Sequence, residues 1–381
     1  MNWEDVIIEA AATDTGMRRA NNQDSLAIVR ASTPDLFKSR GHLFMVADGM
    51  GAHAAGELAS KLACDNIPHT YHKKKSLPPG EALSEAFLDV GGEIFRKAAS
   101  SPEFHRMGTT CTSLVLHPSG LVMAHVGDSR AYRIRAGRID QLSFDHSLVW
   151  ELVRKGHMKL EQVEKAYPRN VITRCLGPEL QVEIDVEGPL PIEMGDVYLL
   201  CSDGLSGPVT DPEIGVFASS FHPADASRYL MHLANLRGGS DNVTVVIVRV
   251  GPWVVPGTEP AVENPGAKKS RGNFLGGFLN NLKNKKNATV DDFEPHQTAE
   301  CRLDRPFVKR MEELVNSSQA SAVELGWSVE WAPLATYRAQ AEEQLKAGKF
   351  RDALESLSEA ISLLGEAGRL HRQNVLEQGR A

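Results

Sequence analysis

The sequence lacks the patterns that would place it in a membrane or in an oxidising compartment. No stretch approaches the ~20 consecutive apolar residues that span a bilayer, and the N-terminal MNWEDVIIEAAATD has no basic segment followed by a long apolar core. The five cysteines are scattered and include no C-x-x-C pair, which indicates reduced thiols rather than a disulfide framework. We therefore expect a cytoplasmic chain without a transmembrane segment.

A strong net charge is also absent. The chain has 42 Lys and Arg against 49 Asp and Glu, a net charge of −7 over 381 residues, so it has no general attraction for nucleic acid. Its apolar share of 42% and charged share of 24% are ordinary for a globular protein. The length suits one large domain plus an extension, or two domains. We expect no nucleic-acid partner.

Three catalytic signatures are missing as well. There is no G-x-S-x-G elbow and no G-x-x-x-x-G-K-[ST] phosphate loop, and no cysteine has an arginine six residues later. These absences exclude the common serine-nucleophile, phosphate-loop and cysteine-nucleophile sites. Any reaction at a phosphate would have to proceed without a covalent nucleophile of these kinds.

What the sequence does contain is an acidic turn after an apolar run, in the stretch His42–Ser60. Leu43–Ala47 is predicted to be a buried strand, and it ends at Asp48-Gly49-Met50-Gly51, after which a helical pattern begins. The glycines let the backbone approach a ligand closely, and the Gly49 carbonyl adds a further oxygen donor. Oxygen donors of this kind suit a hard divalent cation.

Two other interpretations of this turn are open. The spacing Gly49-x-Gly51-x-x-Ala54 also matches a dinucleotide fingerprint, but Asp48 would face the pyrophosphate and no regular βαβ series follows. Asp48 could instead simply cap the helix. The cation interpretation is preferred because similar turns recur at Gly127-Asp128, Asp203-Gly204 and Asp241-Asn242.

These four aspartates each open or close a predicted strand, so a packed pair of sheets could bring them to one edge. Crowded carboxylates repel one another unless a cation neutralises them. An all-oxygen set without a Cys/His cluster favours Mg²⁺ or Mn²⁺ over Zn²⁺. We expect more than one ion, because two ions can share a carboxylate and a water that ionises near neutral pH.

The segment Thr13–Asp24 carries adjacent arginines. On composition alone it is a solvated hairpin loop. The functional interpretation is that Arg19 binds a phosphate, with Asn22, Gln23 and Asp24 behind it. A dinuclear hydroxide beside an arginine then predicts attack on a phosphate ester.

The order of elements favours antiparallel sheets with helices outside them. Two helices are expected at Ala54–Thr70 and Pro79–Ser100, followed by strands with short hairpin connections. A polar insertion runs from Asp145 to about Gly177, and Val197–Cys201 and Val243–Val250 are expected to be buried strands.

Composition changes after Gly251. A Pro- and Gly-rich stretch precedes the basic segment Lys268–Lys286, which is either a flexible tether or an amphipathic element for a membrane surface or an acidic partner. From Arg305 the pattern is helical, and Ala341–Leu363 resembles one tetratricopeptide unit. Because stable arrays need about three units, a helical hairpin packed on a neighbour is the alternative.

Taken together, the first two thirds of the chain resemble the bacterial type of metal-dependent protein phosphatase, the protein phosphatase 2C family. The motifs that carry the resemblance occur in the family's order: Gly16-x-x-Arg19-x-x-Asn22-x-Asp24, Val46-Ala47-Asp48-Gly49-Met50-Gly51, Gly108-Thr109-Thr110, Gly127-Asp128-Ser129-Arg130, Asp145-His146-Ser147, Ser202-Asp203-Gly204 and Asp241-Asn242. The resemblance implies an α+β fold, a four-layer α-β-β-α sandwich of two antiparallel sheets flanked by helices, with a C-terminal helical segment added here. It implies hydrolysis of phosphoserine and phosphothreonine in proteins by a metal-bridged hydroxide.

The resemblance also implies roles for individual residues. Asp48 would bridge two Mn²⁺ or Mg²⁺ ions, with Asp203 and Asp241 on one and the Gly49 carbonyl on the other. Asp128 would hold a third, weaker ion, Arg19 would bind the substrate phosphate, and Asp24 would hold metal-bound water. The insertion after Asp145 resembles the family's flap.

Three positions depart from the family pattern. Gln23 stands where many relatives have Glu, and it offers only a neutral amide. Met50 stands where eukaryotic members have a histidine proposed as general acid, which leaves protonation of the leaving oxygen to another group. Ala52 replaces a glycine common in bacterial members.

We therefore predict a phosphatase domain at 1–251, a flexible basic linker at 252–300 and a helical extension at 301–381. Phosphorylated proteins are the expected substrates, and a protein partner is expected for the C-terminal helices. The rival hypothesis is a catalytically weak phosphatase fold that acts as a binding module through those helices. A third hypothesis keeps the enzyme and assigns regulation or recruitment to the tail.

Overall fold

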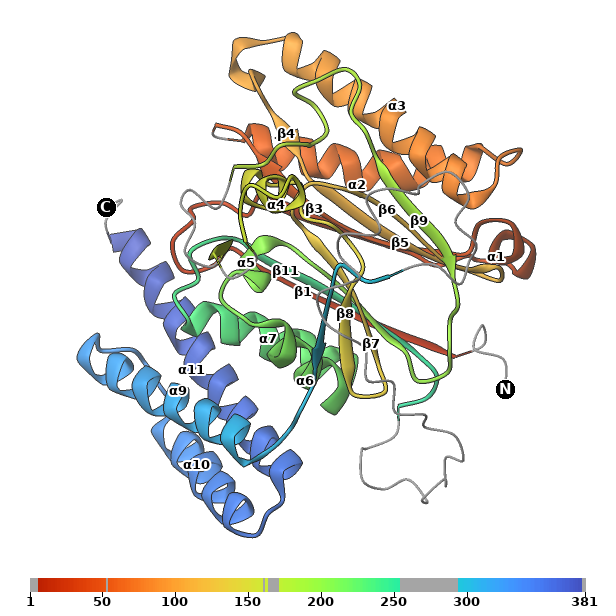
Figure 1. Ribbon diagram of the computed structural model, residues 1–381. Helices are drawn as coiled ribbons and strands as arrows, with labels where there is room; N and C mark the ends of the chain where they lie inside the picture. The colour runs from red at the N-terminus through yellow and green to blue at the C-terminus, as the bar shows by residue number, and fades with distance from the viewer. Residues whose placement is uncertain (1–5, 53, 160–161, 164–170, 254–293, 379–381) are drawn as a thin grey trace.

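Two antiparallel sheets pack face to face at the centre of the molecule (Figure 1). A computed structural model of the chain describes residues 6–52, 54–159, 162–163, 171–253 and 294–378. The first sheet has the order β1 (Ile7–Asp14), β11 (Val243–Val250), β10 (Val197–Cys201), β7 (Arg130–Arg135), β8 (Arg138–Gln141) and β12 (Gln297–Glu300). The second sheet has the order β2 (Asp24–Val29), β3 (His42–Met50), β5 (Cys111–His117), β6 (Gly120–Val126) and β9 (Asp185–Leu190), and β4 (Gly108–Thr109) pairs with the end of β3.

Helices cover the outer face of each sheet. The second sheet is covered by α2 (Ala55–Lys73) and α3 (Pro79–Ala99), and the first by α6 (Asp211–Ser220) and α7 (Pro223–Leu236). Four shorter elements lie in the connections between these strands and helices: α1 (Pro34–Arg40), a 3₁₀ turn at Pro102–Phe104, α4 (Leu148–Arg154) and α5 (Asp203–Ser206). The predicted four-layer sandwich is confirmed.

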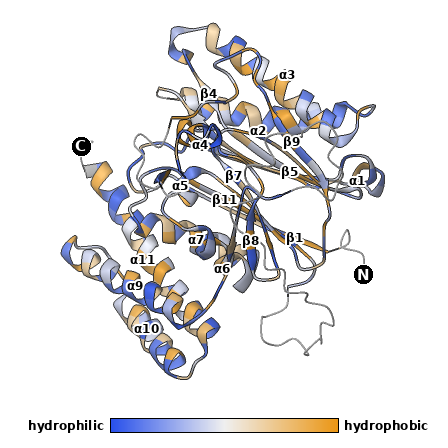
Figure 2. Ribbon diagram, viewed as in Figure 1, coloured by the Kyte–Doolittle hydropathy of each residue, from blue (hydrophilic) through white to orange (hydrophobic). Residues whose placement is uncertain are grey.

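Alternation along the central strands builds three apolar layers. In β3, Leu43 and Met45 pack towards α2 and α3, whereas Phe44 and Val46 pack between the sheets. Side chains on a strand alternate between faces, so a continuous apolar run such as β3 is buried on both sides. Figure 2 shows the result: the central strands are mostly hydrophobic, while the flanking helices mix both kinds of residue.

The C-terminal helices form a further layer outside α7. They are α9 (Arg305–Glu324), α10 (Trp331–Lys346) and α11 (Phe350–Gln378), and α11 lies against α7 (Figure 1). One apolar cluster runs from the strands of the first sheet through Leu230 and Leu233 of α7 to Leu357 and Ile361 of α11. The extension is thus continuous with the core of the sandwich. In the part of the chain that the structure describes, no helix is long and apolar enough to cross a membrane.

Three expectations about connections were wrong. Residues 13–24 do not close a hairpin, because β1 pairs with β11 in one sheet and β2 pairs with β3 in the other. Residues 127–129 likewise cross between sheets, from β6 to β7. The predicted linker is wrong for Gln297–Glu300, which pairs antiparallel with β8; most of that linker, including Lys268–Lys286, lies outside the described residues.

Candidate metal centre

The predicted acidic residues converge at one end of the sheet pair. Asp24, the first residue of β2, lies directly opposite Asp48 near the end of β3 in the strand register. Burial raises the pKa of Asp48 well above its usual range, and the charges of Asp24, Asp203, Asp128 and Asp241 raise it further. All four carboxylates are therefore electrostatic neighbours of Asp48, although they are far apart in sequence.

Asp203 and Asp241 come from the first sheet. Asp203 follows β10 at the start of α5, and Asp241 lies in the turn before β11. Burial and the charge of Asp241 raise the pKa of Asp203 to about 6. Ser202, the residue before Asp203, donates to Asp24 Oδ2 at 2.7 Å and accepts from the Thr244 amide at 3.0 Å, which joins the two sheets beside the acidic residues.

Asp128 occupies the loop that crosses between the sheets. The residue is 8% exposed, and burial together with the charges of Asp203 and Asp145 raises the pKa of its carboxyl well above the usual range. The neighbouring Arg130 forms an ion pair with Asp145 at 2.7 Å rather than with Asp128. Asp128 is therefore adjacent to the acidic group and lacks a basic partner of its own in the salt bridges of the described chain.

The chemistry of this group fits divalent cations. Within the described part of the chain, the buried Oδ1 atoms of Asp24, Asp128 and Asp203 have no hydrogen-bond partner, and burying such atoms unpaired is costly. All donors are oxygens, which suits Mg²⁺ or Mn²⁺. Among the described residues, no three His, Cys, Asp or Glu side chains are already drawn into a closed ligand set, so cation binding would have to draw the carboxylates together.

The backbone around Asp48 is held by the Gly108-Thr109-Thr110 segment. The Thr109 hydroxyl and the Thr110 amide both donate to Asp48 O at 2.9 Å. At Gly49 a Cβ atom would lie 2.0 Å from Gly56 O and 2.6 Å from Gln23 O, so only glycine fits there. The strand end therefore keeps one backbone conformation, which fixes the Cα position of Asp48 and the Gly49 carbonyl.

Arg19 lies beside the acidic group, on the loop between β1 and β2. Its guanidinium donates to Asp241 Oδ2 at 2.6 Å and remains 50% exposed. The side chain of Asn242 holds the loop: it accepts from the Gln23 amide at 2.8 Å and donates to the Thr15 and Asn21 carbonyls at 2.9 Å. Arg19 is thus presented to solvent next to the carboxylates.

Two departures from the family pattern can now be placed. The Gln23 side-chain amide donates to Gly51 O at 3.4 Å, across the turn that follows Asp48. Met50 is half-buried at the end of β3, opposite Gly108. Neither side chain supplies a carboxylate or an imidazole.

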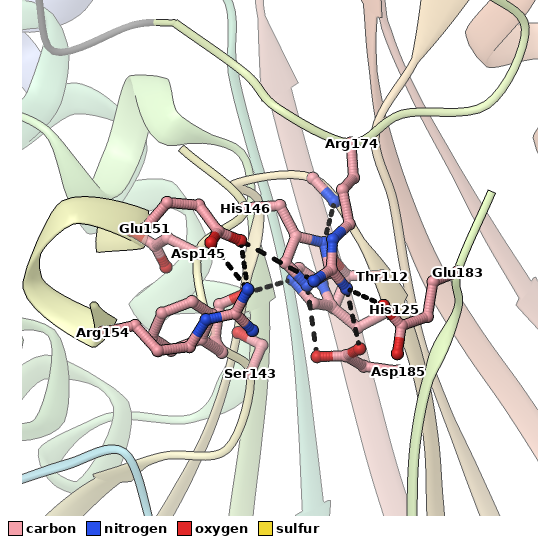
Figure 3. A network of polar contacts seen from close by, with 12 residues as sticks. Thr112, His125, Ser143, Asp145, His146, Glu151, Arg154, Arg174, Glu183 and Asp185 are labelled. Carbon is pink, nitrogen blue, oxygen red and sulfur yellow. Dashed lines mark hydrogen bonds and ion pairs between the residues drawn. The ribbon is translucent and has the colours of Figure 1, made fainter. Parts of the chain in front are cut away.

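The insertion that begins at Asp145 is anchored by a polar network (Figure 3). His146 accepts from the Gly127 amide at 3.1 Å through Nδ1, and its Nε2 lies 3.1 Å from Asp185 Oδ2. Arg174 contacts the same Asp185 at 3.3 Å and Glu151 of α4 at 3.7 Å. Both ends of the described insertion are therefore fixed next to the Asp128 loop.

Sequence reasoning missed the residues that support this centre. Thr109, Thr110 and Ser202 stand within motifs quoted above, but no pattern assigned them a role. Their polar side chains next to buried strands were the available signal, because buried hydroxyls require partners.

The comparison with known families identifies the family of this fold. Residues 17–236 match the model of the family described as protein phosphatase 2C, which is more than half of the chain. The chain belongs to the protein phosphatase 2C family. The matched range includes Arg19, Asp48, Asp128 and Asp203, and it ends just before Asp241 and well before α9.

Several curated relatives are similar to this family member. The serine/threonine protein phosphatase PstP of Mycobacterium tuberculosis is 35% identical over 259 residues, 67% of this chain and 47% of PstP. The match thus spans about half the length of PstP. The serine/threonine phosphatase stp of Listeria innocua is 34% identical over 241 residues, 62% of this chain and 93% of stp.

Solved structures agree with the fold. The crystal structure of the M. tuberculosis phosphatase PstP/Ppp is 33% identical with a TM-score of 0.56, covering 65% of this chain and 99% of that one. The PstP catalytic domain in complex with two manganese ions is 34% identical, with a TM-score of 0.53 and the same coverage.

Proposed function

We propose that this chain is a metal-dependent protein phosphatase that hydrolyses phosphoserine and phosphothreonine in proteins. The observation that carries the proposal is the set of carboxylates around Asp48, next to the exposed guanidinium of Arg19. Three of these neighbours of Asp48 have a buried oxygen without a hydrogen-bond partner in the part of the chain that the structure describes. The relatives named as serine/threonine phosphatases support it.

In this proposal Asp48, Asp203, Asp241 and the Gly49 carbonyl would hold two cations, and Asp24 would support them from β2. Two such ions, when bound, would lower the pKa of a water so that it loses a proton near neutral pH and supplies hydroxide as the nucleophile. A third, weaker ion at Asp128 is the finer part of the proposal, supported by the unpaired Oδ1 of that residue.

Arg19 binds and orients the substrate phosphate. A guanidinium presents paired N–H groups that match two phosphate oxygens. Its ion pair with Asp241 is exposed, so exchange of that carboxylate for a phosphate costs little. The bound phosphate is thereby held next to the carboxylates with its charge neutralised.

The decisive experiment is hydrolysis of a phosphothreonine peptide by the full chain with added Mn²⁺. We expect turnover that a chelator abolishes and that Asp48→Asn lowers by at least a thousandfold. Asp89→Asn, an exposed position on α3 that pairs with Lys74, is the control and should retain full activity. Manganese binding without turnover on any phosphopeptide would instead favour the rival binding-module hypothesis.

For the C-terminal helices we propose a protein partner on their outer faces. The observation that favours it is the exposure of Val323, Leu325 and Trp331 on α9, α10 and the turn between them. The tetratricopeptide-like character of the hairpin and a cytoplasmic location stay predictions. Loss of partner capture on Trp331→Glu, with peptide hydrolysis unchanged, would support this role.

A further inference from the structure

The last helix of the chain contacts the loop that carries Arg19. The Arg372 guanidinium, near the end of α11, donates to Gly16 O at 2.7 Å. Figure 1 shows α11 crossing the outer face of α7, so that its C-terminal part reaches the end of the sheets where β1 leads into the loop. Gly16 is only three residues from Arg19. This contact lies outside residues 17–236, the part that matches the family.

The backbone at Gly16 packs directly against the segment Gly239–Asp241. Gly16 has φ +76°, and a Cβ atom there would lie 2.0 Å from Asp241 O. The Met17 amide donates to Gly239 O at 2.7 Å. A shift of Gly16 would therefore be transmitted to the backbone that carries Asp241 on one side and Arg19 on the other.

The part of α11 that precedes Arg372 is held in place, because it is fixed on α7 at two positions. Glu359 pairs with Arg228 at 3.0 Å and accepts from the Tyr229 hydroxyl. Further along the helix, Gly365 packs against the ring of His232 so closely that a Cβ atom would come within 2.6 Å of Nδ1. Arg372 follows about two turns later on the same helix.

A second tie connects α7 to the beginning of the same loop. Asn235 of α7 donates to Asp14 Oδ1 at 3.0 Å, and that oxygen also accepts from the Gly16 amide at 2.8 Å. The amide of Gly16 is thus held through α7, and its carbonyl is held by α11. The two helices therefore fix Gly16 through different partners.

From this geometry we propose that Arg372 is a positioning residue for the phosphate-binding loop, so that the C-terminal extension sets how tightly substrate phosphate is bound. The inference rests on the proposed function. Arg372 acts through Gly16 and does not itself touch the substrate. A charged donor holds a carbonyl more strongly than a neutral one, so removal of the guanidinium releases the loop at the residue where α11 meets it.

The test compares Arg372→Ala, Arg372→Lys and Arg369→Ala in the full chain. Arg369→Ala removes the same charge one turn earlier on α11, where no hydrogen bond to the loop occurs among the described residues. We expect Arg372→Ala to raise the KM for a phosphothreonine peptide three- to tenfold with a smaller change in kcat. Arg372→Lys should raise the KM less than Arg372→Ala does, because the lysine ammonium also donates to carbonyls. Arg369→Ala should have the KM of the wild type.

A second readout does not depend on catalysis. Hydrogen exchange of the chelator-treated protein should be faster in Arg372→Ala at the amides of residues 16–22 and unchanged in α7. Equal exchange and equal KM in the Arg372→Ala and Arg369→Ala variants would overturn the assignment. So would faster exchange spread over α7 and α11, which would indicate general loosening. If the wild type has no turnover, the proposed function fails, and the exchange result still decides the role of Arg372.

Discussion

Thr110 holds the backbone of Asp48 from both sides. Its hydroxyl accepts from the Asp48 amide at 2.9 Å, and its own amide donates to the Asp48 carbonyl at 2.9 Å. The same hydroxyl lies 2.8 Å from the Ser129 hydroxyl, next to Asp128. One threonine therefore fixes the end of β3 relative to the loop that crosses between the sheets, and so the separation of two proposed ligands.

We predict that Thr110→Val weakens Mn²⁺ binding about tenfold or more. Valine keeps the shape but removes the hydroxyl, and loss of groups that orient metal ligands typically costs 10- to 100-fold in affinity or activity. Leaving the Asp48 amide unpaired should also lower the free energy of unfolding by about 1–3 kcal/mol.

Calorimetric titration with Mn²⁺ measures the first effect and denaturant unfolding the second. Ser113→Ala is the control, since it removes a buried hydroxyl from β5, which begins directly after Thr110. That hydroxyl bonds only to Ala124 O among the contacts described. Unchanged manganese affinity in Thr110→Val would show that the threonine has no part in placing Asp48.

Arg19→Ala should lower activity without lowering stability. The ion pair with Asp241 is half-exposed on the arginine side, and exposed pairs contribute at most about 1 kcal/mol, so the midpoint of thermal unfolding should hardly move. Loss of the phosphate contact should lower kcat/KM by about a hundredfold. Arg18→Ala, the exposed neighbour, is the matched control for charge. A fall in activity of the same size in Arg18→Ala would contradict a specific role for Arg19.

Because the pKa of Asp24 is raised, we predict that the stability of the chelator-treated protein depends on pH. Burial raises its pKa from 3.8 to about 7 in the folded state, with Asp203 and Asp241 adding to the effect. Between these values the folded state holds a proton that the unfolded state has lost, so this group's contribution to stability falls as pH rises from about 4 to about 7. Above pH 7 the buried, ionised Asp24 lowers the free energy of unfolding by its full amount, up to about 4 kcal/mol.

The measurement is the difference in unfolding free energy between the wild type and Asp24→Asn at pH 5 and pH 8. Taking this difference cancels the buried histidines, such as His42, whose lowered pKa of about 4 gives the opposite slope below pH 6.5. We expect the asparagine variant to gain relative stability at pH 8, and Mn²⁺ to reduce that gain by neutralising the carboxylates. A difference that does not vary with pH would exclude the raised pKa.

The sequence was most informative where burial alone determines the pattern. The strands Val197–Cys201 and Val243–Val250 were predicted with the bounds that the structure has, because strands covered on both faces are continuous apolar runs. The acidic turns were visible because each follows or precedes such a run. Their convergence at one end of the sheets was expected, whereas their roles as metal ligands stay a prediction.

The elements and contacts that the sequence did not predict depend on long-range pairing or have only weak local signals. The strand β9 contains Gly188-Pro189 and lacks clear alternation, and α1 spans only seven residues behind its Thr33 cap. Nothing local distinguishes a turn that stays within one sheet from one that crosses to the other, as at residues 127–129. The bond from Arg372 to Gly16 joins residues 356 positions apart, beyond any periodicity.

The packing of α11 on α7 depends on the absence of a side chain at Gly365. Gly365→Val should lower the free energy of unfolding by about 2–3 kcal/mol, because its Cβ would lie 2.6–2.9 Å from three atoms of His232, one of them the Cβ next to the α7 backbone. Glu366→Val places the same side chain at the exposed neighbouring position and should change stability by about 0.5 kcal/mol or less. Thermal unfolding followed by circular dichroism measures both. Adding His232→Ala to Gly365→Val should recover part of the lost stability by making room for the new side chain. Equal stability of Gly365→Val and Glu366→Val would mean that α11 does not pack on α7 at this position.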